Sequence, residues 1–208
     1  MTGRFIVLEG IDGSGTTTQS ARLARRFEES GRSVCLTAEP STGPVGQFLR
    51  RVLRREITDA TGAPHSLPWS AMALLFAADR LDHVETVVRP ALARGSVVVS
   101  DRYVLSSLAY QSLTSPGGAA SLPWITEINS RALRPDLTVV VDVDPDVAAA
   151  RRASRSGPAE LFEVAELQRR LAGAYARAAE LLPGQAVVHV ADGTPDEVHD
   201  RIWMAVTR

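Results

Sequence analysis

Short apolar runs rich in β-branched residues alternate along the chain with longer stretches whose apolar residues recur at helical spacing. Such runs predict buried strands, and a period of three to four residues predicts helices. Five runs have strand character, and each precedes a polar or glycine-containing turn and a helical stretch: 5–8, 33–37, 96–99, 137–143 and 186–190. This alternation predicts an α/β fold in which helices cover both faces of a five-stranded parallel sheet.

The predicted strands end in polar residues that are candidates for a binding site. Ligands of open parallel sheets bind at the C-terminal ends of the strands. This rule selects Glu9-Gly10, Glu39-Pro40, Asp101-Arg102 and Asp142.

The longest helical pattern extends from about residue 69 to residue 93. A second stripe on it brings Phe76, Arg80 and His83 near one another, since residues three and four apart share a helix face. Gly95 is expected to end the helix. The polar stretch 152–158 predicts a loop. The apolar stripe that should face the core consists of Leu74, Leu81, Val84, Val88 and Ala91.

Composition narrows the possible functions. The 208 residues include 23 arginines and no lysine, and the formal net charge is −1. A nearly neutral chain has no bulk attraction to nucleic acid or to a membrane surface, so neither is an expected partner. Cys35 is the only cysteine, which excludes an internal disulfide and a cysteine-based zinc site. With no signal-peptide pattern, a reducing cytoplasm is the expected location.

A glycine-rich segment follows the first predicted strand. It matches the phosphate-binding pattern G-x-x-x-x-G-K-[ST] at Gly10, Gly15 and Thr17, but Thr16 stands at the lysine position. Glycines let backbone N–H groups converge on phosphate oxygens, and the following helix N-terminus adds positive potential. We therefore expect a nucleotide to bind here, along Gly10, Ile11, Asp12, Gly13, Ser14, Gly15, Thr16, Thr17 and Thr18.

Without the lysine, the loop lacks the positive point charge that normally contacts the terminal phosphates of the nucleotide. Because the chain has no lysine anywhere, the replacing cation must be an arginine, a metal ion or a partner molecule. A simple coding bias toward arginine also explains the lack of lysine. Arginine has a planar fork of donors suited to phosphate, so the replacement is reasonable but needs different geometry.

Asp101 ends the third predicted strand, in the run Val-Val-Val-Ser-Asp-Arg-Tyr at 97–103. In P-loop enzymes an acid here holds Mg²⁺ or its water shell, while the loop hydroxyl binds from the other side. Thr17 and Asp101 are therefore the predicted Mg²⁺ site. The alternative for Asp101 is a helix N-cap.

Several motifs, taken in order and spacing, resemble the thymidylate kinase family. They are Gly-Ile-Asp-Gly-Ser-Gly at 10–15, Glu39-Pro40, Leu-Phe-Ala-Ala-Asp-Arg at 75–80, Asp101-Arg102-Tyr103 with Ala109-Tyr110-Gln111, and Arg-Pro-Asp-Leu at 134–137. The resemblance implies a P-loop NTPase-type three-layer fold in one domain of residues 1–208, similar to nucleoside monophosphate kinases. It also implies transfer of the γ-phosphoryl of ATP to dTMP with Mg²⁺, giving dTDP and ADP for dTTP biosynthesis.

The resemblance also implies which residues bind dTMP. Phe76 would stack on the thymine ring, and Arg80 would reach a base carbonyl or the monophosphate. Arg102 and Arg50 would grip the monophosphate. The other implied pocket residues are Glu39, Tyr103 near the sugar, Ser107, Tyr110 and Gln111. From the residues alone, Phe76 could be a core aromatic and Arg50 a solvated charge.

Two groups of residues are implied in catalysis. Asp12 would contact the sugar 3′-hydroxyl, with an Asx turn as its alternative role, and Arg102 would act beside it. Residues 151–163 resemble the lid over ATP, whose candidate catalytic arginines are Arg151, Arg152 and Arg155. The family's acid-Arg-x-Glu pattern reads Glu160-Leu161-Phe162-Glu163 here, so one arginine is lost. We hypothesise that a lid arginine replaces the loop lysine; exposed surface arginines are the alternative.

Two other functions stay open at this point. A kinase for another nucleoside or nucleotide would keep the loop, although Phe76, Arg80 and Tyr103 argue against it. A nucleotide-binding protein with little catalysis would explain Thr16 and Leu161, but would have no chemical need for a retained acceptor pocket. Family members commonly form homodimers through long helices, so helix 69–93 is a predicted dimer contact.

Overall fold

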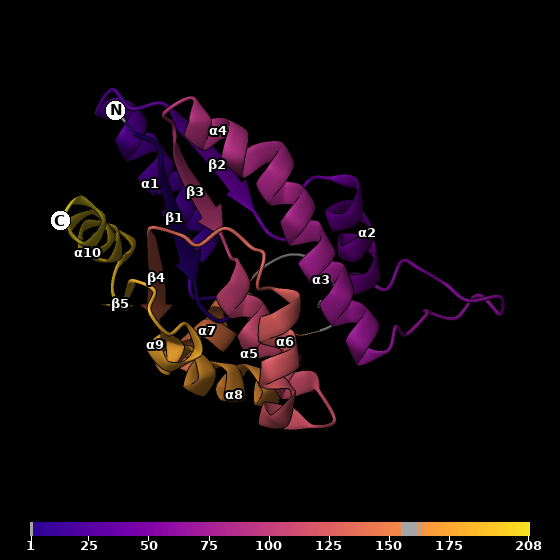
Figure 1. Ribbon diagram of the computed structural model, residues 1–208. Helices are drawn as coiled ribbons and strands as arrows, with labels where there is room; N and C mark the ends of the chain where they lie inside the picture. Colours follow the sequence, from indigo (N-terminus) through magenta and orange to yellow (C-terminus); the bar gives the residue numbers. More distant parts are fainter. Residues whose placement is uncertain (1, 155–161, 163) are drawn as a thin grey trace.

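The computed structural model describes residues 2–154, 162 and 164–208. Five strands form one sheet in the order β2-β3-β1-β4-β5 (Figure 1). Every neighbouring pair is parallel. The predicted α/β fold is therefore confirmed, and all five strands lie within two residues of their predicted bounds: β1 (Arg4–Glu9), β2 (Val34–Ala38), β3 (Val97–Asp101), β4 (Leu137–Asp142) and β5 (Val187–Ala191).

Helices cover both faces of this sheet. On one face lie α1 (Thr16–Glu29) and α10 (Pro195–Thr207). The other face is covered by α3 (Trp69–His83), the π-helical turn η1 (Val84–Val88), α4 (Arg89–Ala93), α5 (Val104–Thr114) and α8 (Ala165–Ala176). The remaining helical elements are α2 (Pro44–Leu53), η2 (Gly118–Ser121), α6 (Leu122–Ile128), α7 (Pro145–Ala153) and α9 (Ala178–Leu181).

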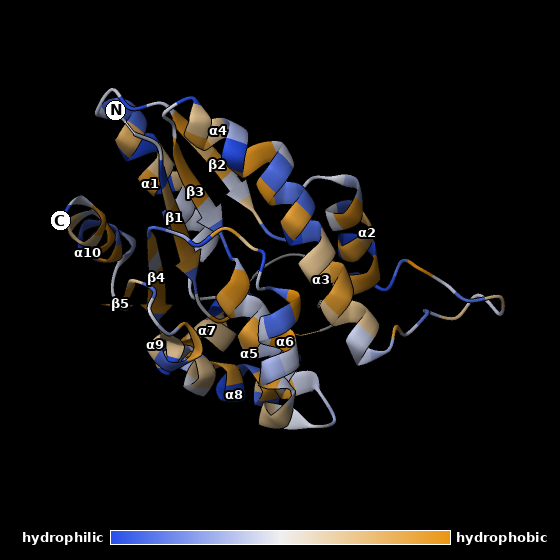
Figure 2. Ribbon diagram, viewed as in Figure 1, coloured by the Kyte–Doolittle hydropathy of each residue, from blue (hydrophilic) through white to orange (hydrophobic). Residues whose placement is uncertain are grey.

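Alternation along β1 supplies both halves of the core. Ile6 and Leu8 pack toward α1 and α10, where they meet Leu23. Phe5 and Val7 point to the opposite face and pack against η1 and α4. Successive strand side chains point to opposite faces, so a fully buried central strand is apolar at every position. Figure 2 shows this as orange central strands, with blue positions on the outer faces of the helices.

The predicted long helix is confirmed as one continuous run through α3, η1 and α4. Gly95 follows it with φ +80°, the left-handed conformation expected after a helix end. The prediction that Leu74 faces the core is wrong, because 49% of its surface is exposed. The buried face of the helix instead contains Ala73, Ala77 and Arg80. Because Arg80 is charged, the apolar pattern did not indicate that this face is the buried one.

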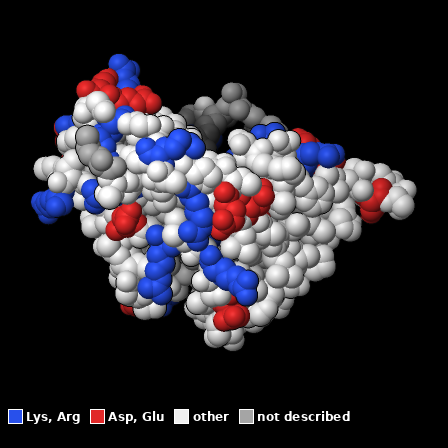
Figure 3. All heavy atoms as spheres, turned by 45° about the horizontal axis from the view of Figure 1, so that its top comes forward, with Lys and Arg blue, Asp and Glu red and all other residues white. Residues whose placement is uncertain are grey.

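The topology places the phosphate loop beside the end of β3. β1 lies between β3 and β4, so the chain leaves β1 at the point where the strand order reverses. Crevices of this kind are where open α/β sheets bind ligands. Among the described residues, none of the helices is long and apolar enough to cross a membrane. On the face drawn in Figure 3, arginines and acidic side chains are interspersed among uncharged ones.

The core assignment predicts the outcome of a pair of leucine substitutions. Leu23→Ala removes a side chain that is 0% exposed between α1 and the sheet, and should lower the free energy of unfolding by about 2–5 kcal/mol. Leu36→Ala, at a position 49% exposed on β2, should cost less than about 1 kcal/mol. Urea unfolding measures both values, and equal losses would contradict this description of the core.

Candidate active site

The glycine loop bends tightly between β1 and α1. Gly13 and Gly15 have φ values of +91° and +93°, which side chains rarely permit. A Cβ on Gly13 would also lie 2.4 Å from the carbonyl oxygen of Ala148, so α7 packs directly on the loop backbone. The loop and the first turn of α1 enclose a cavity of about 110 Å³, lined by Asp12, Gly13, Gly15, Thr16, Thr17, Thr18 and Arg102.

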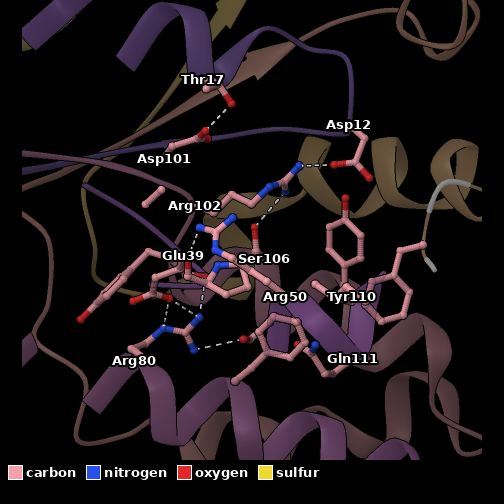
Figure 4. A pocket seen from close by; sticks show the side chains of 17 residues that line it. Asp12, Thr17, Glu39, Arg50, Arg80, Asp101, Arg102, Ser106, Tyr110 and Gln111 are labelled. Atoms are coloured by element: carbon pink, nitrogen blue, oxygen red, sulfur yellow. Dashed lines mark hydrogen bonds and ion pairs between the residues drawn. The ribbon is translucent and has the colours of Figure 1, made fainter. Parts of the chain in front are cut away.

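A larger cavity of about 410 Å³ adjoins the first and shares Asp12, Thr17 and Arg102 with it (Figure 4). All nine residues predicted to bind the acceptor line this cavity: Glu39, Arg50, Phe76, Arg80, Arg102, Tyr103, Ser107, Tyr110 and Gln111. Asp101 lines it as well. The structure thus brings together residues that lie far apart in the sequence.

Arg102 and Asp12 form the contact between the two cavities. Arg102 Nη2 lies 2.5 Å from Asp12 Oδ1. Nη1 of the same guanidinium donates to the carbonyl oxygen of Gly10 at 3.0 Å and to Ser106 Oγ at 3.2 Å. The Arg102 backbone has φ +71°, a conformation uncommon for a side-chain-bearing residue. This turn directs the guanidinium back over the phosphate loop.

Arg80 is the centre of a buried polar network in the cavity wall. Its Nε donates to Glu39 Oε2 at 2.9 Å, and Nη2 lies 2.8 Å from the same oxygen. Nη1 donates to Ser107 and to Asn129, and Nη2 also donates to the carbonyl oxygen of Tyr103. These contacts occupy all five N–H groups of the guanidinium. A direct bond from Arg80 to a base or phosphate would therefore replace one of them, and that contact stays a prediction.

Arg50 is held at the cavity by the segment after β2. It donates to the carbonyl oxygens of Pro40 and, at 3.5 Å, Ser41. Ser41 is fixed in turn by the buried carboxylate of Asp79, which accepts from its backbone N–H at 2.7 Å and from its hydroxyl at 2.5 Å. Gly46 packs against this turn, where a Cβ would lie 2.2 Å from the Ser41 carbonyl oxygen. Arg50 is thus partly ordered before any ligand binds.

Thr17 and Asp101 meet as predicted for a divalent cation site. Thr17 Oγ1 donates to Asp101 Oδ2 at 2.5 Å. Asp101 Oδ1 is buried and has no hydrogen-bond partner within the described part of the chain. A buried carboxylate oxygen without a partner is unfavourable, and a cation or its water would satisfy it. The N-cap of α5 is Tyr103 rather than Asp101. No cluster of three or more metal-ligating side chains occurs among the described residues.

Some predicted residues lie away from both cavities. Ile11 is a core residue, so a nucleotide could meet only its backbone, and Gly10 and Ser14 do not line either cavity. Asp142 is also outside, 2.8 Å from His189. Arg151 pairs with Asp192 at 3.1 Å, whereas Arg152 donates to the carbonyl oxygen of Asp12. Arg155 lies outside the described residues, as do Glu160, Leu161 and Glu163.

Sequence reasoning missed several contributors to the site. Ser106 and Phe162 line the larger cavity, and Leu53 closes another part of its wall. Ser106 stands next to a family motif and Phe162 inside the altered lid pattern, so both had a weak signal. Gln168, on α8, contacts the phosphate loop and had no signal at all.

Glu9 is a buried carboxylate beneath the site. Its Oε1 accepts from the backbone N–H groups of Tyr103 at 2.8 Å and Ser106 at 3.2 Å. Its Oε2 accepts from Ser106 Oγ at 2.6 Å and Tyr175 Oη at 3.3 Å. Burial raises the pKa of Glu9 above its ordinary value of 4.5, although the hydrogen bonds from Ser106 and Tyr103 and the charge of Arg102 act in the opposite direction. Glu9 thereby fixes the start of α5 and the segment that holds Arg102.

Comparison with known proteins identifies close relatives over almost the whole chain. The sequence profile of the thymidylate kinase family matches residues 8–202. A probable thymidylate kinase of Pyrococcus abyssi is 43% identical over 203 residues, which are 97% of this chain and 95% of the relative. A probable thymidylate kinase of Pyrococcus horikoshii is 40% identical over the same shares. A thymidylate kinase of Solidesulfovibrio magneticus is 37% identical over 97% of this chain and 98% of its own.

Glu9 gives a pH-dependent prediction for stability. Because its pKa is raised in the fold, the folded state binds this proton more tightly than the unfolded state does. Protonated Glu9 therefore stabilises the folded state at low pH, and this stabilisation is lost as the pH rises through the raised pKa. Glu9→Gln lacks this loss, so its stability relative to the parent should increase from pH 4.5 toward pH 8. Thermal unfolding of both proteins across that range measures the difference, and a constant difference would contradict the prediction.

Proposed function

The chain belongs to the thymidylate kinase family, and we propose that it transfers the γ-phosphoryl of ATP to dTMP at the two adjoining cavities. The observation that supports this most is the position of Asp12, Thr17 and Arg102, which line both cavities. Phosphoryl transfer needs a donor phosphate and an acceptor phosphate in line and in contact. Residues shared by two cavities are where such phosphates would meet.

ATP would bind with its phosphates in the smaller cavity. Thr16, Thr17 and Thr18 begin α1 there, so backbone N–H groups of a first helical turn are available to phosphate oxygens. Mg²⁺ would be held by Thr17 and Asp101, whose unpaired carboxylate oxygen suits a hard cation. When bound, the ion supplies positive charge to the phosphates.

dTMP would bind in the larger cavity. Its volume of about 410 Å³ is within the usual range for small-molecule sites. Phe76 and the buried Arg80 network form the wall suited to the base, and Arg50 and Arg102 supply charge suited to the monophosphate. Asp12, next to Arg102, is the candidate for the 3′-hydroxyl. The buried Tyr103 would leave little room beside the sugar, which supports preference for a deoxynucleotide.

The chemistry asks the protein for positioning and charge rather than for a strong base. The acceptor phosphate oxygen is already anionic, so its attack requires no proton removal. Arg102 and Arg50 would hold the acceptor, and backbone N–H groups of the loop would hold the donor. Positioning and electrostatic stabilisation account for most of the rate in this class of reaction.

We propose that Arg152 supplies the charge that the loop lysine would otherwise provide. Of the two lid arginines that the structure describes, Arg152 is the one whose guanidinium contacts the phosphate loop, through the carbonyl oxygen of Asp12. Arg151 is engaged with Asp192 instead. Thr16 is buried at the lysine position, and its short side chain leaves room in the smaller cavity. The phosphate loop would then be a functional variant whose missing charge comes from the lid, residues 151–163.

We also propose that two copies associate through α3 and α6. Leu74 on α3 is 49% exposed and Trp124 on α6 is 37% exposed, and these two helices contact each other. Exposed large apolar side chains on two neighbouring helices are of the kind that a protein partner covers. Sedimentation should give the mass of two chains, and Leu74→Asp should shift it to one. A monomeric parent protein would contradict the proposal.

The proposed reaction predicts selective turnover. Purified protein with MgATP should form ADP with dTMP and much less with dUMP, dCMP, dGMP or thymidine. Thymidine lacks the anionic phosphate acceptor, and the other bases differ from thymine where they would meet the wall of Phe76 and Arg80. A coupled ADP assay measures this directly. Binding of dTMP without ADP formation above background would instead favour a nucleotide-binding protein with little catalysis. Preference for another monophosphate would favour a related kinase.

A further inference from the structure

Gln168 is a fully buried polar side chain that the reaction outlined above does not use. It lies on α8, and none of its surface is exposed. Its side-chain amide reaches across to the phosphate loop, more than 150 residues earlier in the sequence. Burial of an amide is unfavourable unless its hydrogen bonds are made, so these contacts determine where Gln168 can lie.

The Gln168 amide makes three hydrogen bonds to two residues of the site. Oε1 accepts from the backbone N–H of Asp12 at 3.1 Å. Nε2 donates to Asp12 Oδ2 at 2.8 Å and to the carbonyl oxygen of Phe162 at 2.9 Å. A side-chain amide has one acceptor and two N–H donors in fixed directions, which matches this set. A glutamate would accept from the Asp12 N–H but could not donate to a carboxylate.

These bonds complete the fixation of Asp12. Its other carboxylate oxygen is 2.5 Å from Arg102, and its carbonyl oxygen accepts from Arg152. The backbone N–H, the carbonyl and both carboxylate oxygens of Asp12 therefore all have protein partners. Loss of the Gln168 side chain would leave the Oδ2 atom and the backbone N–H of Asp12 without these partners. Asp12 lines both cavities, so the change would affect the site directly. Arg102 alone cannot fix the plane of the carboxylate.

The third bond links Asp12 to the wall of the acceptor cavity. Phe162 lines that cavity, and its ring centroid lies 5.6 Å from that of Tyr110 in an edge-on arrangement. Tyr110 lines the cavity too and lies under the Arg102 guanidinium, 5.4 Å from it. Through one amide, Gln168 thus sets the relative positions of an aromatic wall and a carboxylate in the same cavity.

We propose that Gln168 is a positioning residue for acceptor recognition, which orients the Asp12 carboxylate toward the sugar 3′-hydroxyl. This inference rests on the proposed acceptor role of Asp12. Gln168 itself does not touch the acceptor and is not a catalytic residue. Its effect should therefore appear in discrimination between acceptors that differ only at the 3′ position, a property that general packing does not influence.

The test compares dTMP with 3′-deoxy-dTMP as acceptors. In Gln168→Leu, kcat/KM for dTMP should fall about tenfold more than kcat/KM for 3′-deoxy-dTMP, since the lost orientation matters only when the hydroxyl is present. The measured quantity is the ratio of kcat/KM for dTMP to kcat/KM for 3′-deoxy-dTMP. Asp12→Asn is the reference variant and should reduce this ratio. Arg170→Leu, an exposed position on the same helix, is the matched control and should leave the ratio unchanged.

Thermal unfolding checks that each variant is folded. If Gln168→Leu fails to fold, Gln168→Glu retains the size and the acceptor oxygen and should show the same loss of discrimination. A parental ratio in the folded Gln168 variant, together with a reduced ratio in Asp12→Asn, would overturn the inference and leave the role of Asp12 intact. A parental ratio in Asp12→Asn would overturn the proposed sugar contact and this inference with it.

Discussion

The ion pair between Arg102 and Asp12 joins the two halves of the site. It connects the loop after β1 with the turn after β3, two neighbouring strands of a parallel sheet, at a separation of 2.5 Å. Both side chains are largely buried, so water screens their attraction less than it would a surface pair. Glu9 fixes the backbone beyond Arg102, and Gln168 fixes Asp12. The pair therefore holds the loop after β1 and the turn after β3 together at the point where the two cavities adjoin.

Two arginines from neighbouring elements lie at the phosphate loop, which has no lysine of its own. Arg102 lines the smaller cavity, and the guanidinium of Arg152 reaches the opposite side of the loop at the Asp12 carbonyl. A lysine extends from the loop as a single flexible charge, whereas an arginine presents a planar fork and must approach from a neighbouring element. In the proposed arrangement the positive charge would therefore come from the turn after β3, which carries Arg102, and from Arg152 on α7, rather than from the loop itself.

The sheet and the polar residues at the ends of its strands were predictable from local patterns, whereas most of the cavity residues, such as Arg50, Phe76 and Ser107, were predicted from the resemblance to the thymidylate kinase family. Buried parallel strands are continuous apolar runs, and the polar residues that follow them converge at one edge. The prediction that Leu74 faces the core was wrong, because the charged residue Arg80 lies on the buried face of α3 and that face therefore does not look apolar in the sequence. Nothing in the sequence indicated Gln168, since a single amide on an amphipathic helix has no pattern. Its importance depends on contact with Asp12, which only the tertiary fold creates.

We propose that an arginine of the 151–163 segment, Arg152, replaces the loop lysine. The direct measurement is kcat for Arg152→Ala and Thr16→Lys, singly and together, beside Arg151→Ala and Arg155→Ala. We expect Arg152→Ala to lower kcat by about 10²-fold, and Thr16→Lys to recover most of that loss while changing the parent little. Full activity in Arg152→Ala would contradict this assignment, whatever Arg151→Ala and Arg155→Ala show, and so would a Thr16→Lys gain that is equal with and without Arg152.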